Sequence, residues 1–309
     1  MRRYLVRRAL QCLPVLVLVV LAGFALVRLM PGDPAEAALG LGASAEDLAN
    51  ERRRQGLDRP VSAQLGIYVR QLVTLDLPPA RSGQPIWQKL LEAFGVTLRL
   101  GLGALTVALA VGLGLALVSA RWPGGPIDWA ARVLAVAGVS VPVFWLAMLL
   151  VALFALRLGL LPAGGCRPGE LSGWILPCLA LGLVYSASLA RVGRAALIEE
   201  LGKPYCVAAR ARGRSRWGVL VDHALPNAMV PIVTVIGSQL AGLLTGAVLT
   251  ETVFGLPGLG LVLYDAIESQ ERYLLVTALL LVAAIFVAIN FLLDVVYAWL
   301  DPRVRYGRG

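Results

Sequence analysis

Charged side chains, histidines and paired cysteines are scarce in this sequence, and each shortage excludes a class of protein. Only 15% of the 309 residues are charged, whereas 58% are hydrophobic. Soluble domains carry about 25% charged and about 45–50% apolar residues. So little charge cannot cover the surface of a soluble enzyme, and so much apolar surface does not stay disordered. With a mean hydropathy of +0.77, the composition predicts an integral membrane protein.

The sequence lacks the residue patterns that usually bind metals, form disulfides or bind nucleotides. The single histidine, His223, excludes a His-rich metal site and an HExxH motif. Gly202-Lys203 is not a phosphate-binding loop, because position 197 is leucine rather than glycine. We therefore expect no catalytic residue, no metal site and no bound cofactor on this chain. The cysteines form no CxxC pair and predict neither a disulfide framework nor a zinc site; they are Cys12, Cys166, Cys178 and Cys206.

Six long stretches without Asp, Glu, Lys or Arg dominate the pattern. About 20 apolar residues form a helix that crosses the hydrocarbon core, and backbone groups in lipid must pair within that helix. The stretches therefore predict an all-α membrane protein with six transmembrane helices. They are residues 9–27, 100–120, 133–156, 171–190, 224–250 and 273–293.

The net charge of +9 is concentrated at the two termini and in alternate connections, namely those after the second and fourth stretches. The positive-inside rule places these parts, and so both termini, in the cytoplasm, which explains the basic charge without nucleic-acid binding. The expected organisation is an N-terminal tail and first helix at 1–30, an extracytoplasmic segment at 31–94, a transmembrane domain at 95–300 and a cytoplasmic tail at 301–309.

The extracytoplasmic segment contains two predicted helices. Residues 44–56 favour a helix capped by Ser44, with Glu46 and Asp47 in its first turn. Residues 61–75 predict an amphipathic helix on the outer membrane face, since their apolar residues recur at helical spacing: Leu65, Tyr68, Val69 and Leu72.

The most informative connection is residues 197–226, between the fourth and fifth stretches. Pro204 can begin a helix, Gly213 can end it in the left-handed conformation, and Ser215 can cap a second short helix over 216–223. One interpretation is a solvated basic loop that only sets the topology. A protruding helix that fits a groove on another protein is favoured instead by three small residues, Ala208, Ala209 and Ala211.

The same connection resembles the cytoplasmic EAA loop of bacterial ABC importer membrane subunits, whose pattern is EAA-x3-G-x9-I-x-LP. Val207 stands in place of the glutamate and His223 in place of the isoleucine. Residues 208–213 (AARARG) and 223–231 (HALPNAMVP) are similar to the form found in the peptide and nickel permease branch.

Three further stretches resemble the B-type permeases of that branch. Residues 28–35 (RLMPGDPA) are similar to RLxPGDPA, 251–260 (ETVFGLPGLG) to ExVFxxPGLG, and 300–307 (LDPRVRYG) to LDPRxRYG. The matches occur in order along the whole chain.

The resemblance implies the type I ABC importer fold and a permease subunit for dipeptides or oligopeptides in a bacterial inner membrane. Nickel or metallophore complexes and glutathione are alternative substrates. The implied partners are a second homologous permease, two ABC ATPase subunits that hold ATP and Mg²⁺, an extracytoplasmic substrate-binding protein, and lipid. The residues implied to contact the ATPase or set the loop geometry are Val207, Ala208, Ala209, Arg210, Ala211, Arg212, Gly213, Ser215, Leu225 and Pro226.

Four residues near the ends or interior of the spans are further candidates. Gly242 and Gly246 allow close helix packing or face the pathway. Glu251 belongs to an outer gate or to a structural re-entrant loop, and Asp294 has a transport role or pairs with an arginine at the interface. An ion-driven secondary transporter is the alternative class of function, but it usually needs ionisable residues at membrane depth, and the six stretches contain none.

Overall fold

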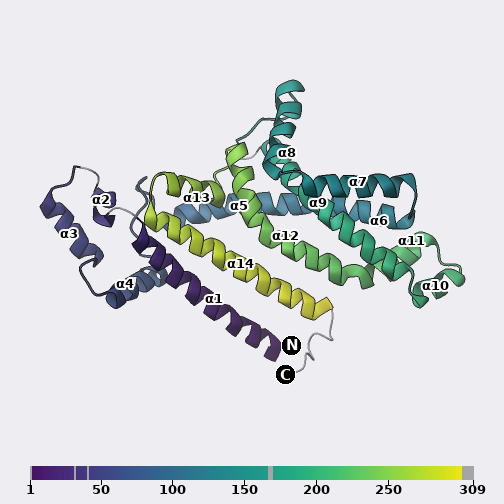
Figure 1. Cartoon of the computed structure of the whole chain (residues 1–309), viewed down its shortest axis with the longest axis horizontal. Coiled ribbons are helices and arrows are strands. Elements are labelled where there is room, and N and C mark those ends of the chain that lie inside the picture. Colours follow the sequence, from purple (N-terminus) through teal and green to yellow (C-terminus); the bar gives the residue numbers. More distant parts are fainter. Residues whose placement is uncertain (1, 31–32, 40–41, 166–169, 301–309) are drawn as a thin grey trace. The chain divides into compact units, whose positions relative to one another are not determined.

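The computed structural model describes residues 2–30, 33–39, 42–165 and 170–300. Throughout these ranges the regular elements are helices, as the composition predicts (Figure 1). In chain order they are α1 (Arg2–Leu29), α2 (Pro34–Leu39), α3 (Ala45–Gln55), α4 (Val61–Thr74), α5 (Ile86–Ala108), η1 (Leu109–Leu113), α6 (Gly114–Arg121), α7 (Pro126–Ser140), α8 (Val143–Leu150), η2 (Val151–Arg157), α9 (Ser172–Leu201), α10 (Pro204–Ala211), α11 (Arg216–Val219), η3 (Leu220–Ala224), α12 (Leu225–Phe254), α13 (Leu259–Glu268) and α14 (Arg272–Leu300).

Several of these helices are long and apolar enough to cross a membrane. The described residues contain five such helices, or up to seven if each of two bent helix pairs is one span. The six expected spans fall within this range. The expected second span is the end of a longer continuous helical run, Ile86–Arg121, which contains the π-helical turn η1. The expected tail, residues 301–309, lies outside the described residues.

The expected third span, residues 133–156, is not a single helix. α7 and α8 are bent by 107° at the break between them. Pro142 causes the break, because its ring lacks an N–H donor and forces the preceding residue out of the helical region. Val141 accordingly has an extended backbone, with φ −85° and ψ 123°. The prediction of one uninterrupted helix is corrected here to a broken one.

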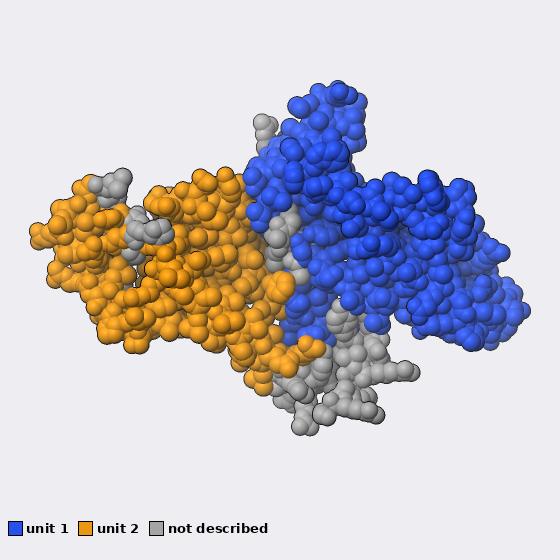
Figure 2. Space-filling model, in the orientation of Figure 1, with its two compact units in different colours: residues 1–6, 97–256, 289–309 blue, residues 7–96, 257–288 orange. Residues whose placement is uncertain are grey.

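The chain divides into two compact units (Figure 2). Unit 1 contains residues 1–6, 97–256 and 289–309, and unit 2 contains residues 7–96 and 257–288. The two units do not follow the expected domain boundaries. α13 and the first part of α14, which come late in the chain, belong to the same unit as residues 7–96.

In unit 1, α9 is the central helix, with α6, α7, α8 and α12 packed against it. Glycine permits the closest approaches, since it has no Cβ. A Cβ on Gly112 would lie 2.7 Å from the carbonyl oxygen of Ser186, and one on Gly182 would lie 2.6 Å from the carbonyl oxygen of Ala104. Both obstacles are backbone atoms, so any larger residue would push the helices apart.

In unit 2, the buried cluster joins the start of α5 to α13 and α14. Ile86 and Leu90 pack with Leu259 and Leu274. A Cβ on Gly23 of α1 would lie 2.8 Å from a methyl group of Val276, so α1 also lies close to α14. This unit contains most of the segment that connects the first and second expected spans.

Both helices predicted in that segment are present. α3 begins after Ser44, whose hydroxyl accepts the N–H of Asp47 at 3.1 Å, so the predicted cap is confirmed. α4 matches the predicted amphipathic helix. Tyr68 is its buried anchor: it is 5% exposed, and its ring centroid lies 5.8 Å from that of Phe24 of α1, with the rings tilted by 43°. Val69 is 39% exposed on the same helix.

Candidate functional site

A short helical hairpin connects α9 to α12 (Figure 1). Pro204 occupies the first turn of α10, where a missing N–H costs nothing. Gly213 follows with φ +84°, a left-handed conformation that reverses the chain. Ser215 then accepts the N–H of Gly218 at 3.1 Å and caps α11. The predicted helix start, turn and second cap are therefore confirmed.

The second helix of the hairpin continues further than predicted. α11 runs through the π-helical turn η3 directly into α12. Pro226 accounts for this turn, because it has no N–H to bond within the helix. The N–H of Leu225 bonds to the carbonyl oxygen of Leu220, five residues earlier. Leu225 and Pro226 therefore form a continuous helical junction with the expected fifth span.

One face of the hairpin is part of the core of unit 1. Cys206 is fully buried and Ala209 is 3% exposed, in a cluster that includes Leu197, Val219 and Leu220. The expectation that Ala209 contacts another protein is therefore corrected: its side chain has almost no free surface. Its small size instead lets α10 lie close to α9 and η3. The sequence spacing alone does not show which of the alanines faces inward.

The opposite face of α10 is exposed, and it is covered by small and basic residues. Val207 is 49% exposed. The residues that follow Val207 are also exposed, except for Ala209: they are Ala208, Arg210, Ala211, Arg212 and Gly213. Because small side chains let another backbone approach closely, this exposed face is suited to a tight contact with a partner.

Some of the arginines on the hairpin serve its own structure. Arg210 donates from Nη2 to the carbonyl oxygen of Leu201 at 2.8 Å, and Arg214 forms an ion pair with Asp222. Arg212 and Arg216 make no ion pair with any residue in the part of the chain that the structure describes. These two arginines leave positive charge on the exposed surface.

Glu200 ties the base of the hairpin to the end of α9. Lys203 Nζ lies 2.5 Å from Glu200 Oε1, and the hydroxyl of Tyr205 donates to Glu200 Oε2. The hydrogen bond to Glu200 raises the pKa of Lys203. Burial, and then the hydrogen bond to Glu200, raise the pKa of the Tyr205 hydroxyl. Lys203 therefore stays charged and Tyr205 stays protonated at physiological pH, and both keep α10 in place.

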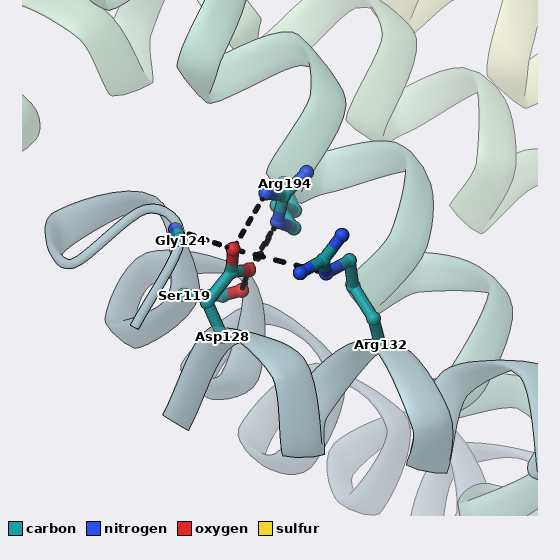
Figure 3. Close-up of polar contacts among 5 residues, drawn as sticks. All are labelled: Ser119, Gly124, Asp128, Arg132 and Arg194. Atoms are coloured by element: carbon teal, nitrogen blue, oxygen red, sulfur yellow. Dashed lines mark hydrogen bonds and ion pairs between the residues drawn. The ribbon is translucent and has the colours of Figure 1, made fainter. Parts of the chain in front are cut away.

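A second polar cluster joins three helices near the hairpin (Figure 3). Asp128, in the first turn of α7, is fully buried. It accepts hydrogen bonds from the Ser119 hydroxyl, from the Gly124 N–H at 2.9 Å, and from Arg194 Nε and Nη2 at 2.5 and 2.8 Å. Arg132 Nε lies 3.8 Å away. The cluster fixes the ends of α6 and α7 to α9.

Sequence reasoning missed this cluster. Asp128 was visible as an acid between two arginines, in the first turn of a helix that begins at Pro126. Its main partner, Arg194, lies 66 residues further along the chain. No local spacing connects two residues so far apart, so only the tertiary structure brings them together.

An aromatic contact connects the hairpin to the turn between α6 and α7. The rings of Trp122 and Trp217 meet edge to face, with their centroids 6.0 Å apart. The guanidinium carbon of Arg121 lies 4.9 Å from the centroid of the Trp122 ring, within the range of a cation–π interaction. The hairpin is therefore supported from both sides of its connection, by α9 and by this turn.

Comparison with known families assigns the chain. A family model described as "Binding-protein-dependent transport system inner membrane component" matches residues 112–306, and a model for the N-terminal part of such membrane components matches residues 1–100. The chain belongs to this family. It is accordingly a multi-pass inner membrane protein and a membrane component of a binding-protein-dependent transport system.

Curated relatives cover nearly the whole chain. The dipeptide transport system permease protein DppB of Alkalihalophilus pseudofirmus is 35% identical over 99% of this chain and 100% of its own. A putative peptide transport system permease of Brucella abortus is 38% identical with the same coverage. The glutathione transport system permease protein GsiC of Escherichia coli is 35% identical, again over 99% and 100%.

Solved structures of the MetNI methionine ABC transporter in inward-facing conformations have a similar fold. One gives a TM-score of 0.58 at 18% identity and another 0.57 at 21% identity. Each covers 70% of this chain and 98% of the MetNI chain. The likeness confirms the type I ABC importer fold.

The candidates near the far end of α12 belong to the packed interior of unit 1. Glu251 is fully buried and accepts a hydrogen bond from the Thr97 hydroxyl at 2.6 Å. Phe254, one turn further on, accepts the N–H of Gly165 at 2.9 Å through its carbonyl oxygen. Gly255 then ends α12 with φ +61°. This packing favours the structural interpretation of Glu251 over a freely moving gate.

The remaining candidates are not brought together. A Cβ on Gly242 would lie 3.3 Å from the Tyr185 hydroxyl oxygen, so this glycine packs against α9. The surroundings of Gly246 lie outside the described residues, and Asp294 is half-buried in α14. Among the described residues no cluster of His, Cys, Asp and Glu could hold a metal ion, and Cys12, Cys178 and Cys206 form no disulfide with one another; Cys166 is not described.

Proposed function

We propose that this chain is the permease subunit of an ATP-driven peptide importer, and that the α10–α11 hairpin couples it to separate ATPase subunits. The two ATPase subunits bind ATP and Mg²⁺, while this chain itself holds no cofactor and catalyses no reaction. A second, homologous permease completes the translocation pathway. A substrate-binding protein delivers peptide to the extracytoplasmic segment at residues 31–94.

The observation that carries the coupling role is the division of α10 into two faces. Cys206 and Ala209 fix one face in the core of unit 1, and the other face exposes Val207, Ala208 and Ala211. A helix held this firmly moves together with the helices behind it. Movement of an ATPase against the exposed face would therefore reach α12 through the continuous junction at Leu225 and Pro226 and bias the bundle between two arrangements.

Peptide is the substrate favoured by the relatives. The relatives named for dipeptide or peptide transport are 35–38% identical over nearly the full chain. Glutathione is the second candidate, because a permease named for glutathione transport is 35% identical over the same length. Glutathione is itself a short peptide, so one pathway chemistry suits both. Uptake of labelled dipeptide and labelled glutathione by cells with and without the intact chain separates them.

Replacement of Ala208 tests the coupling face. We expect Ala208→Trp to leave the chain folded, because this side chain is exposed, and to abolish or strongly reduce copurification of the ATPase subunits and peptide uptake. The matched control is Ala152→Trp on η2, which makes the same change at another exposed alanine. Copurification is measured by gel filtration, and uptake with labelled dipeptide.

Two results would contradict the proposal. One is normal ATPase assembly and normal uptake with tryptophan at position 208. The other is an equal loss in the control variant, which would show that any bulky exposed residue disturbs the assembly. Transport by the isolated chain under an ion gradient without ATP would favour the secondary-transporter alternative instead.

A further inference from the structure

A narrow groove of about 240 Å³ lies between α6, α7 and α9, beside the Asp128 cluster. Its apolar lining consists mainly of small side chains, among them Ala131, Ala135 and Ala190. Three arginines line the same groove: Arg132, Arg191 and Arg194. A groove with an apolar floor and guanidinium groups fits a molecule that has a hydrocarbon part and an anionic part.

The charges in the groove are not balanced. Asp128 takes both hydrogen bonds from Arg194 and is itself fully buried behind the groove. Arg132 is 52% exposed on its side chain and approaches Asp128 only to 3.8 Å. Arg191 is exposed and has no ion pair to any of the described residues. The groove lining contains no Asp or Glu among the described residues. Asp128 thus pairs with two of the three guanidinium groups, with Arg194 closely and with Arg132 at 3.8 Å.

Neighbouring aromatic residues indicate the level of the groove in the membrane. Trp122 and Trp129 lie at the turn between α6 and α7, and they are 42% and 63% exposed. Tryptophan is enriched where the hydrocarbon core meets the headgroups. Beyond Trp129, the exposed side of α7 is apolar, with Val133, Leu134 and Val136. The arginines therefore lie at headgroup level, and the alanine floor continues toward the hydrocarbon.

We propose that this groove binds one anionic glycerophospholipid of the cytoplasmic leaflet. Its phosphate is held by Arg132 and Arg191, and an acyl chain lies against the alanines of α7 and α9. Basic pockets between membrane helices on the cytoplasmic side hold anionic headgroups by this combination of charge and apolar surface. The leaflet assignment rests on the cytoplasmic position of the hairpin, which is part of the proposed function.

The test is a titration of the purified full-length chain with phosphatidylglycerol in detergent, with bound lipid counted by native mass spectrometry. We expect one tightly held phosphatidylglycerol. Arg132→Gln combined with Arg191→Gln should weaken its binding roughly 30-fold, because each basic side chain near an anionic headgroup contributes a factor of about five. The matched control, Arg53→Gln with Arg54→Gln, removes the same charge from exposed positions in α3 and should bind lipid normally.

A second variant keeps every arginine. Ala195→Glu adds a carboxylate at an exposed position that lines the groove, one helical turn from Arg191, and it should also weaken phosphatidylglycerol binding. Because position 195 is exposed, this variant is expected to fold, which gel filtration verifies.

Several results would overturn the inference. Unchanged lipid binding in both groove variants, or an equal loss in the α3 control, would show that the groove is not the site. Equal binding of phosphatidylcholine would show that the arginines do not select the lipid, and equally tight binding of inorganic phosphate would indicate a site for free anions. Protection of the groove by the second permease, with no lipid retained, would make it a protein interface. Uptake is not the readout, so failure of the transport proposal remains a separate result.

Discussion

Asp128 is a carboxylate held inside the protein by four hydrogen bonds from three other residues. The effect on stability of removing such a buried ion pair depends on whether one partner or both partners are replaced. Removing one partner leaves a charge in a poorly solvated place, whereas replacing both partners with apolar groups is often neutral. The pair therefore allows a decisive comparison of single and double variants.

We expect Asp128→Ala to lower the free energy of unfolding by about 3 kcal/mol, because Arg194 loses its main partner in a largely buried place. Adding Arg194→Leu should recover part of this loss. The matched control is Asp222→Ala, which breaks the exposed pair with Arg214 and should cost under about 1 kcal/mol. Thermal unfolding of the detergent-purified protein measures all three. Equal losses for Asp128→Ala and Asp222→Ala would show that the buried cluster contributes no more to stability than an exposed ion pair.

Gly213 is restricted by its backbone conformation rather than by its neighbours. Its φ is +84°, and a Cβ built on it would meet no heavy atom within 4 Å. Gly213→Asn should be tolerated, Gly213→Ala should cost about 1 kcal/mol, and Gly213→Pro should abolish the turn because proline fixes φ near −65°. We expect the proline variant to lose ATPase assembly or to hydrolyse ATP without uptake. Normal uptake per ATP hydrolysed in that variant would refute the proposed role of the turn.

At the scale of the helix, α10 has one face that is buried in the core and one face that is exposed. The sequence shows three alanines and two arginines in a row, and spacing alone does not say which of them point inward. The structure assigns Ala209 to the core and Ala208 to the surface. The two neighbours should therefore fail in different ways when they are enlarged.

We expect Ala209→Trp to destabilise the hairpin, since overpacking a filled core typically costs about 1–3 kcal/mol. Limited proteolysis should then cut within residues 203–214 faster than in the unaltered chain. Ala208→Trp, in contrast, should resist proteolysis like the unaltered chain and fail only in ATPase binding. The same protease sensitivity in both variants would mean that the two faces of α10 are not distinct.

α3 is held by an ion pair that predicts a dependence on pH. Arg52 pairs with Asp33, which also accepts the N–H of Ala35 at 3.0 Å. Burial favours the neutral acid, but the Ala35 N–H and the Arg52 guanidinium outweigh it, so the pKa of Asp33 is lowered. A lowered pKa means that the pair stabilises the folded segment above the ordinary pKa of aspartate and that this contribution is lost as the pH falls through the lower value.

Pepsin cleavage within α3 should therefore rise as the pH falls below the ordinary aspartate pKa of 3.8 and through the lowered pKa of Asp33. Asp33→Asn should be cleaved readily across this range, and its cleavage should change little as the pH is lowered. If the unaltered chain and Asp33→Asn respond to pH identically, another group controls the segment.

For the whole molecule, orientation in the membrane is the property on which the proposed function depends. Ser62 lies in α4 and is exposed, and Ala208 lies on the hairpin and is also exposed. In a chain with its native cysteines replaced, we expect Ser62→Cys to react with an impermeant thiol reagent in intact cells with an opened outer barrier. Ala208→Cys should react only after the inner membrane is broken. The opposite pattern would reverse the topology.

Much of the hairpin could be predicted because its signals are local. Pro204, Gly213 and Ser215 each act on backbone groups within about one turn, so the sequence around them is sufficient to place a start, a turn and a cap. Pro142 carried the same kind of signal for the bend between α7 and α8. A count of uncharged residues does not reveal this bend, because it measures the length of an apolar run and not its straightness.

The sequence by itself determined the membrane class, the family and the positions of most helices, because composition, periodicity and capping depend on residues that are near one another along the chain. Only the tertiary structure decided that Asp128 meets Arg194, that Ala209 turns inward while Ala208 stays free, and that three arginines share one groove. Each of these depends on how separate helices pack, and packing joins residues whose separation along the chain has no fixed relation to their distance in space.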